Sequence, residues 1–208
     1  MPKISRERRE ARRMQILEAA WRCFYRKGLH EATMQDIIRT SGLSAGAVYL
    51  YFPSKEKIIL DAIQTSLGAV RMIVTESVEK DDYDSLTHLL IKLATAIDTF
   101  AVREGYDLRS IALLGWSEAQ TNDRVREVML PIYNDFLAQF RAAVRRGQKR
   151  GIAVRDVSAN AAASVFLSLL MGNVVQAALL GNNPTRLVLR GTAGLQPLKV
   201  AKRRGEPC

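Results

Sequence analysis

Residues 44–55, with the sequence SAGAVYLYFPSK, combine small side chains at one end with aromatic side chains at the other. The segment begins Ser-Ala-Gly-Ala, and Tyr49, Tyr51 and Phe52 follow before Pro53. A helix can enter the major groove of DNA, about 12 Å wide, when its leading face carries little bulk. Tyrosine hydroxyls can reach phosphates or base edges from the rim of the groove. These residue types indicate a helix built for close approach to a nucleic acid.

Catalytic chemistry is not indicated by the other polar residues. The chain has two histidines, His30 and His88, and no set of His, Cys, Asp and Glu at metal-ligand spacing. No glycine loop that could cradle a phosphate follows a strand pattern, and no pairing of a nucleophile with a base stands out. We therefore expect a protein that is not an enzyme and that needs no cofactor and no metal.

The groove-compatible segment is positioned by two preceding helices. Residues 6–27 have helical periodicity and end at Gly28. Thr33 and Asp36 predict a capping box for a short helix that ends near Gly42. Ser44 then predicts the cap of a third helix, which cannot pass Pro53. Two helices joined by a short glycine-containing turn form the helix-turn-helix pattern, whose second helix enters the major groove.

The rest of the chain also predicts helices, so the expected fold class is all-α. Sustained alternation of apolar and polar residues, which would indicate strands, is absent from the sequence. Pro131 is expected to kink its helix because proline removes a backbone donor. Serine or asparagine caps and glycine stops predict helices over residues 54–80, 85–105, 107–120, 122–150 and 158–180, with a last short helix from Asn183-Pro184.

The positive charge of the 208-residue chain, net +10, is concentrated near its beginning. Residues 1–57 hold 12 Lys/Arg and 6 Asp/Glu, whereas residues 58–198 hold 15 and 14. This placement favours a polyanionic partner, with DNA and a membrane surface as the alternatives. No apolar run reaches the ~18 residues that span a bilayer, so we expect no membrane partner. Two isolated cysteines and the absence of an apolar leader predict a cytoplasmic protein.

The first 60 residues resemble a known family. The string ILEAAWRCFYRKGLHEATMQDIIRTSGLSAGAVYLYFPSKEKI is similar to the DNA-binding domain of the TetR family of bacterial transcriptional regulators, over about residues 10–60. Beyond that range the similarity is one of helical layout only. The matching positions are Ile16-Leu17, Ala19-Ala20, Phe24, Gly28, Thr33, Ile37, Gly42-Leu43-Ser44, Gly46, Tyr49, Tyr51-Phe52 and Lys55.

The resemblance implies a homodimer that binds a palindromic double-stranded DNA operator and a small-molecule inducer. The expected domains are a helix-turn-helix domain over 1–53 and a ligand-binding and dimerisation domain over 54–195. Residues 54–80 form the connecting helix between them, and a basic disordered tail covers 196–208. Family members often have histidine or arginine at the position of Tyr51 and polar residues at Ala45 or Ala47. Because alanines stand here, we expect fewer direct hydrogen bonds to bases. The implied DNA contacts are Thr33, Ser44, Ala45, Gly46, Tyr49, Tyr51 and Lys55.

Aromatic and methionine side chains of the C-terminal part favour a largely apolar or aromatic inducer, although any one of them could belong to the core instead. Asn173 and Gln176 could orient a ligand or bond across a dimer interface formed by residues 158–181 and 184–190. The candidate ligand residues are Phe100, Trp116, Met129, Tyr133, Phe136, Phe166, Asn173 and Gln176, with Trp116 and Phe136 first.

Repression by an inducer-released dimer is the main functional hypothesis. A ligand-independent, architectural DNA-binding protein and an activator of the same family are the alternatives that the sequence leaves open.

Overall fold

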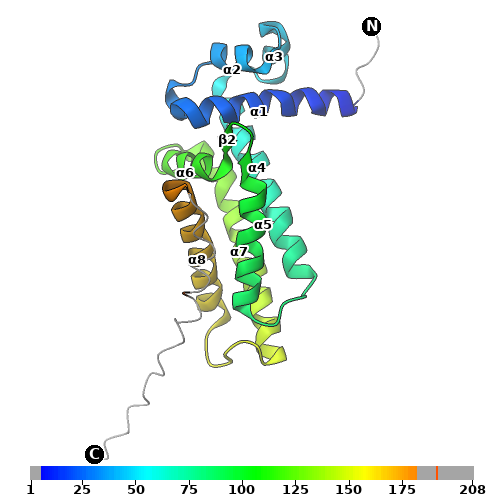
Figure 1. Cartoon of the computed structure of the whole chain (residues 1–208), viewed down its shortest axis with the longest axis vertical. Helices are drawn as coiled ribbons and strands as arrows, with labels where there is room; N and C mark the ends of the chain where they lie inside the picture. Colours follow the sequence, from blue (N-terminus) through cyan, green and yellow to red (C-terminus); the bar gives the residue numbers. More distant parts are fainter. Residues whose placement is uncertain (1–5, 182–190, 192–208) are drawn as a thin grey trace, which may run out of the picture.

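The computed structural model describes residues 6–181 and residue 191, and its architecture is all-α (Figure 1). The expected short helix over 184–190 and the expected tail over 196–208 lie outside the described residues. In chain order the elements are α1 Arg6–Glu31, α2 Met34–Ser41, α3 Ala45–Tyr51, α4 Lys55–Glu79, α5 Leu86–Ala101, β1 Val102–Arg103, β2 Tyr106–Asp107, α6 Leu108–Glu118, α7 Asp123–Arg150 and α8 Ala159–Leu180.

The caps of α2 and α3 lie at the residues that the sequence indicates, whereas α1 continues beyond the expected end at Gly28 to Glu31. Gly28 interrupts α1 with φ 79° and ψ 172°, a conformation that glycine adopts at little cost. At the start of α2 the Thr33 hydroxyl accepts a hydrogen bond from the Asp36 N–H, and the Asp36 carboxylate accepts one from the Thr33 N–H. The expected capping box is confirmed. Gly42 then ends α2 in the left-handed region, at φ 69°.

The remaining helices form a bundle below α1 (Figure 1). In that view α2 and α3 lie on one side of α1, and α4, α5, α7 and α8 extend away from its other side. Within the bundle α4 packs against α5 and α7, and α8 packs against α5, α6 and α7. The short α6 lies between the bundle and α1, and it contacts both α1 and α8. Because α6 is shared in this way, it joins the two ends of the molecule.

Two local expectations need correction. The helix that contains Pro131, α7, continues through it to Arg150, and the expected kink stays a prediction. Gly105 does not end α5, because α5 stops at Ala101 and Gly105 instead lies in the turn of a short antiparallel hairpin, at φ 86°. Ser158 occupies the N-cap position of α8, yet its side chain makes no capping hydrogen bond.

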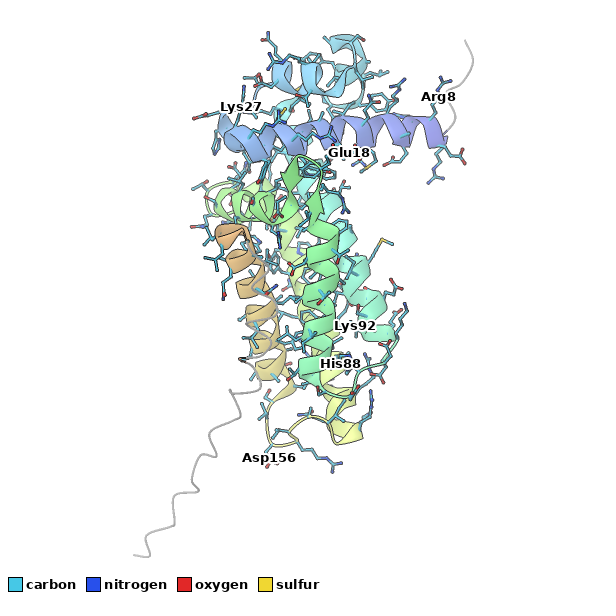
Figure 2. All side chains as sticks on the ribbon, viewed as in Figure 1. Arg8, Glu18, Lys27, His88, Lys92 and Asp156 are labelled. Atoms are coloured by element: carbon cyan, nitrogen blue, oxygen red, sulfur yellow. The ribbon has the colours of Figure 1, made fainter. Side chains whose placement is uncertain are left out.

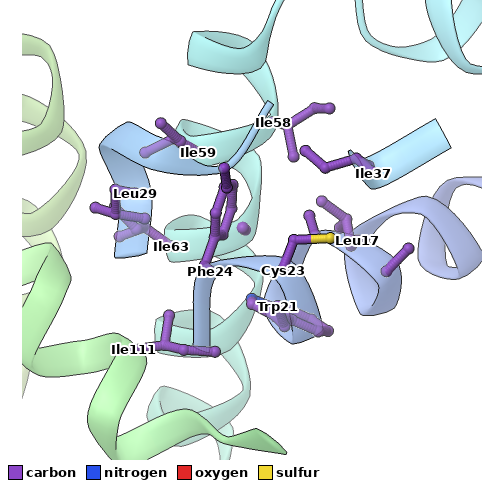
Figure 3. Packing of buried hydrophobic residues seen from close by; sticks show 14 of the residues in the cluster. Leu17, Trp21, Cys23, Phe24, Leu29, Ile37, Ile58, Ile59, Ile63 and Ile111 are labelled. Atoms are coloured by element: carbon purple, nitrogen blue, oxygen red, sulfur yellow. The ribbon is translucent and has the colours of Figure 1, made fainter. Parts of the chain in front are cut away.

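Buried side chains form two hydrophobic clusters. The first joins α1 to α2, α3, α4 and α6, and Figure 3 shows Phe24 and Trp21 of α1 near Ile63 of α4 and Ile111 of α6. The second fills the bundle between α4, α5, α7 and α8, and the rings of Phe140 and Phe166 lie tilted to each other by 46°, with 4.7 Å between their centroids. Helices α4 and α7 contribute to both clusters, so the two ends share long structural elements.

Two helices, α4 and α8, are long and apolar enough to cross a membrane by length and composition alone. Only a third of the apolar window of each is buried inside the chain. Core helices of globular proteins have the same composition, so this feature is weak evidence for a membrane. Several apolar side chains of α8 are exposed, among them Val165, Leu179 and Leu180.

Candidate DNA-binding surface and ligand cavity

Helix α3 has a buried face and an exposed face. Val48 and Phe52 are buried against the first cluster, as the sequence analysis expected. The Ser44 hydroxyl accepts a hydrogen bond from the Ala47 N–H at 3.3 Å and caps the helix. Its exposed face begins with the small residues Ala45 and Gly46. One face of α3 therefore packs on the first cluster, and its small N-terminal residues are exposed to solvent.

The exposed face continues with two large side chains. Tyr49 is 49% exposed and Leu50 is 75% exposed. Sequence reasoning missed Leu50, although its position next to Tyr49, opposite the buried Val48 and Phe52, could have identified it. An exposed leucine on this face suits a thymine methyl group. Tyr51, by contrast, is half-buried and packs on the first cluster.

A group of charges holds α2 against α1. The Asp36 carboxylate accepts hydrogen bonds from Lys27 Nζ at 2.8 Å and from Arg39 Nη2 at 2.9 Å, in addition to the capping box. The bond from Lys27 and those from Thr33 hold the pKa of Asp36 well below its usual range. The Thr33 hydroxyl also donates to Asp36, at 2.9 Å. Thr33 is exposed, and its capping role fixes the position from which it would meet DNA.

Positive charge also extends along α1. The N-terminal half of this helix passes beyond the part covered by α2 and α3, and Arg8 is labelled at its end in Figure 2. The arginines there, Arg6, Arg8, Arg9 and Arg12, are all exposed. His88, Lys92 and Asp156 lie towards the other end of the molecule (Figure 2). The helix-turn-helix end therefore carries a row of cationic side chains that can meet a phosphate backbone.

A cavity of about 80 Å³ lies inside the bundle. Residues from α4, α5, α6, α7 and α8 line it, and nearly all of them are apolar. Four polar or charged residues contribute to its wall: Ser66, Arg109, Trp116 and Tyr133. An apolar cavity with a few polar groups is the usual form of a small-molecule site.

Four of the eight candidate ligand residues line this cavity, namely Phe100, Trp116, Tyr133 and Phe136. The other four lie elsewhere. Met129 is buried in the first cluster, and Phe166 is buried in the second. On α8, Asn173 is buried and Gln176 is exposed, and neither belongs to the lining.

The Arg109 side chain is buried in the cavity wall with its charge paired. Its Nη1 donates to Asp98 at 2.9 Å, and its Nη2 donates to Asp107 at 2.6 Å. The hydrogen bonds with Asp107 contribute most to raising the pKa of Arg109, so its guanidinium is cationic. Asp107 is also the N-cap of α6, where it accepts from the Arg109 N–H. This group fixes the start of α6 against α5.

Comparisons with known proteins agree with this geometry. Residues 16–62 match the description "Bacterial regulatory proteins, tetR family", and residues 95–193 match "BetI-type transcriptional repressor, C-terminal". The chain belongs to the TetR family. It is therefore a helix-turn-helix transcriptional regulator and not an enzyme.

Individual TetR-family relatives cover most of the chain. The HTH-type transcriptional regulator YfiR of Bacillus subtilis (strain 168) is 29% identical over 86% of this chain and 85% of its own length. The HTH-type transcriptional repressor BepR of Brucella suis biovar 1 (strain 1330) is 27% identical over 89% and 87%. A Saccharomonospora viridis structure in complex with choline is 26% identical, with a TM-score of 0.70 over 89% of this chain and 95% of that one.

In this TetR-family chain, contacts at the end of α6 connect the cavity region to the helix-turn-helix. Trp116 of α6 lines the cavity, and Glu118 follows two residues later. The Glu118 carboxylate lies 3.1 Å from His30 Nε2 and accepts a hydrogen bond from Asn122 Nδ2 at 2.9 Å. The carbonyl of His30 in turn accepts a hydrogen bond from Lys55 Nζ at 2.7 Å. A continuous set of polar contacts thus runs from α6 to Lys55, one of the candidate DNA contacts.

Proposed function

We propose that this chain is a ligand-responsive repressor that binds a palindromic operator as a homodimer in the cytoplasm and is released by a small, largely apolar or aromatic inducer. The observation that supports this most is the position of α6. One helix lines the cavity through Trp116 and contacts the helix-turn-helix through Glu118. A change of cavity volume that displaces α6 would therefore reach the DNA-binding end.

For DNA binding, we propose contacts from Thr33, Ser44, Ala45, Gly46, Tyr49, Tyr51 and Lys55, and we add Leu50. The small residues at the start of α3 permit close approach to the groove, and Leu50 supplies an apolar contact. Lys55 already donates to the His30 carbonyl, but an ammonium group has three N–H donors. Two donors of Lys55 are therefore available for phosphate oxygens.

For dimerisation, we propose that α8 packs against α8 of a second copy. Val165 and Leu179 are 60% and 72% exposed on this helix, and Leu180 is 59% exposed. Burial of such side chains in an interface would stabilise the association. Ala163 is already buried within the chain, so enlarging it would disturb the bundle rather than the interface. Val165→Glu combined with Leu179→Glu changes exposed positions only, and we expect it to give monomers in analytical ultracentrifugation.

Release requires that the inducer bind the conformation that does not fit DNA more tightly than the one that does. Helix α4 lines the cavity through Leu67, Val70 and Val74, and it begins at Lys55 beside the helix-turn-helix. Ligand-induced displacement of α4 and α6 would change the separation of the two recognition helices in the dimer. Binding to half-sites one DNA turn apart, about 34–36 Å, is sensitive to that separation.

Choline is a second candidate ligand because a relative has been solved with it. Aromatic faces in the cavity wall, such as those of Trp116 and Phe136, can hold a quaternary ammonium group. The lining includes no aspartate or glutamate among the residues that the structure describes. We therefore place apolar and aromatic compounds first.

The DNA half of the proposal can be tested by selecting binding sites from random duplex DNA with the full chain. We expect the enriched sequences to form an inverted repeat, and the absence of any enriched sequence would contradict the proposal. With the selected site, Lys55→Ala should weaken binding and lower the slope of log K against log salt by about 1. Lys149→Ala, an exposed charge near the end of α7, is the control and should leave the slope unchanged.

The ligand half can be tested by screening aromatic and apolar compounds, with choline included, for release of the selected DNA. We expect at least one compound to release the DNA and to raise the melting temperature of the free protein. DNA binding that no compound affects would favour the ligand-independent alternative. The position of the selected site relative to its promoter distinguishes a repressor from an activator.

A further inference from the structure

The polar groups of the cavity wall differ in whether they already have partners. The Ser66 hydroxyl donates to the Ile63 carbonyl at 3.1 Å. The Arg109 guanidinium is bound to Asp98 and Asp107. By contrast, the indole Nε1 of Trp116 is buried and has no hydrogen-bond partner among the described residues. An indole N–H is a donor only, so the group left without a partner can be satisfied only by an acceptor.

The Tyr133 hydroxyl is the nearest polar group to this indole. Burial raises the pKa of Tyr133, and the hydrogen-bond interaction with the Trp116 indole lowers it, although the indole N–H does not reach the distance and angle of a formed hydrogen bond. Tyr133 is also in edge-to-face contact with Phe136, at 6.0 Å between ring centroids, so its ring is held in the wall. The cavity therefore has one polar corner, formed by Trp116 and Tyr133, in an otherwise apolar wall whose remaining polar groups are already paired.

We propose that this corner selects ligands that carry a neutral hydrogen-bond acceptor, such as a carbonyl oxygen, next to an apolar or aromatic body. The acceptor would take the Trp116 indole hydrogen, and the Tyr133 hydroxyl would donate to the same atom. A buried donor without a partner is costly, so satisfying it favours an acceptor-bearing ligand over a hydrocarbon of the same shape. This inference rests on the proposed function, because it concerns the same cavity.

Acetophenone and ethylbenzene are suitable probes because they differ only by a carbonyl oxygen in place of two hydrogens. We expect the full chain to bind acetophenone more tightly than ethylbenzene, and Trp116→Phe to reduce that preference by about tenfold, the effect of one hydrogen bond. Phenylalanine retains a ring in the wall and removes the N–H. Tyr133→Phe should reduce the preference by a smaller factor. Thermal unfolding of each variant shows whether it retains the fold.

The two tryptophans of the chain, Trp21 and Trp116, provide an internal control. Both indole N–H groups are buried without a partner among the described residues, but Trp21 stacks on Tyr106 outside this cavity. In a ¹H–¹⁵N correlation spectrum, acetophenone should move the Trp116 indole signal downfield and leave that of Trp21 in place. Ethylbenzene should produce no downfield shift.

Three outcomes would overturn the inference. If the wild type and Trp116→Phe prefer acetophenone over ethylbenzene by the same factor, the Trp116 indole does not recognise the carbonyl. The inference would then be rejected, and the proposed function would be unaffected. Tighter binding of tetramethylammonium than of acetophenone would show that the aromatic wall binds a cation rather than a neutral acceptor. Binding of neither aromatic compound would refute acceptor recognition, whereas the proposed function is judged separately, by selection of DNA sites and release of the selected DNA.

Discussion

The helix-turn-helix and the cavity differ in how their polar groups are satisfied. At the start of α2 the Asp36 carboxylate accepts four hydrogen bonds, from the Thr33 N–H, the Thr33 hydroxyl, Lys27 and Arg39, and the Asp36 N–H donates a fifth to the Thr33 hydroxyl. In the cavity wall the Trp116 indole has no partner among the described residues. The first arrangement fixes a surface in one shape for DNA. The second leaves an indole N–H donor to which a bound ligand can supply an acceptor.

The largest expected effects come from the two hydrophobic clusters that support these regions. Phe24→Ala in the first cluster and Phe140→Ala in the second should each lower the free energy of unfolding by about 3–5 kcal/mol. Because α4 and α7 belong to both clusters, we expect each variant to show one unfolding transition in urea, monitored by circular dichroism. Two separate transitions would mean that the two ends fold independently.

The second prediction concerns the charges at Asp36. Asp36→Asn should lower the urea midpoint because the amide is a weaker acceptor for Lys27 and Arg39. The pKa of Asp36 is lowered in the folded state from an ordinary value of 3.8, so the carboxylate stabilises the fold above that pH. The advantage of the wild type should be constant between pH 5 and 7 and should shrink as the pH falls below about 4.

The control for that titration is Asp156→Asn, which makes the same charge change at an exposed loop residue. Its midpoint should follow that of the wild type at every pH. An Asp36→Asn difference that persisted unchanged at pH 3 would show that the carboxylate charge does not stabilise α2.

The third prediction compares two glycines with free space around them. Gly42 has φ 69°, and a Cβ there would meet nothing within 4 Å, so Gly42→Ala tests backbone strain alone. We expect a loss of about 1 kcal/mol. Gly68 lies inside α4, also with nothing within 4 Å, and Gly68→Ala should stabilise the helix by up to about 1 kcal/mol. Effects of the same sign in thermal unfolding would contradict the assigned turn.

The smallest expected effect on stability concerns the link between the two regions. Glu118→Gln weakens the contact with His30, whose side chain is exposed, so stability should change by less than about 1 kcal/mol. If α6 transmits ligand binding, the effect of an inducer on DNA affinity should fall by about two- to fivefold. Glu127→Gln on the exposed face of α7 is the control. Unchanged coupling in Glu118→Gln would remove this contact from the mechanism.

The helix-turn-helix could be predicted from the sequence because its signals are local. Thr33, Gly42 and Ser44 each act on a backbone group within three residues of themselves. Membership of the TetR family was identified from that same segment and agrees with the comparisons. Pairing of the hairpin after Ala101 was missed because its strands are only two residues long and leave no alternation to detect.

The cavity could be predicted only in part because its lining depends on contacts between distant segments. Met129 and Tyr133 are one turn apart on α7 and both contact the first cluster, yet only Tyr133 lines the cavity. Phe166 faces Phe140 rather than the cavity for the same reason. Residue type indicated that these side chains would be buried, but the packing of neighbouring helices decides which of them face the cavity.

The contact between α1 and α6 also limits where such a chain can be joined to another protein in a chimera. Ile111 of α6 and Ile63 of α4 pack with Phe24 and Trp21 in the first cluster. Part of the core of the helix-turn-helix end therefore comes from helices of the bundle. A chimera joined just after Pro53 would replace Ile63 and Ile111 with residues of another protein, and α1 would lose part of the core on which it packs. A chimera that keeps α1 together with its own α4 and α6 should retain this core and fold. The segment that must be exchanged as one piece is therefore longer than the first 53 residues.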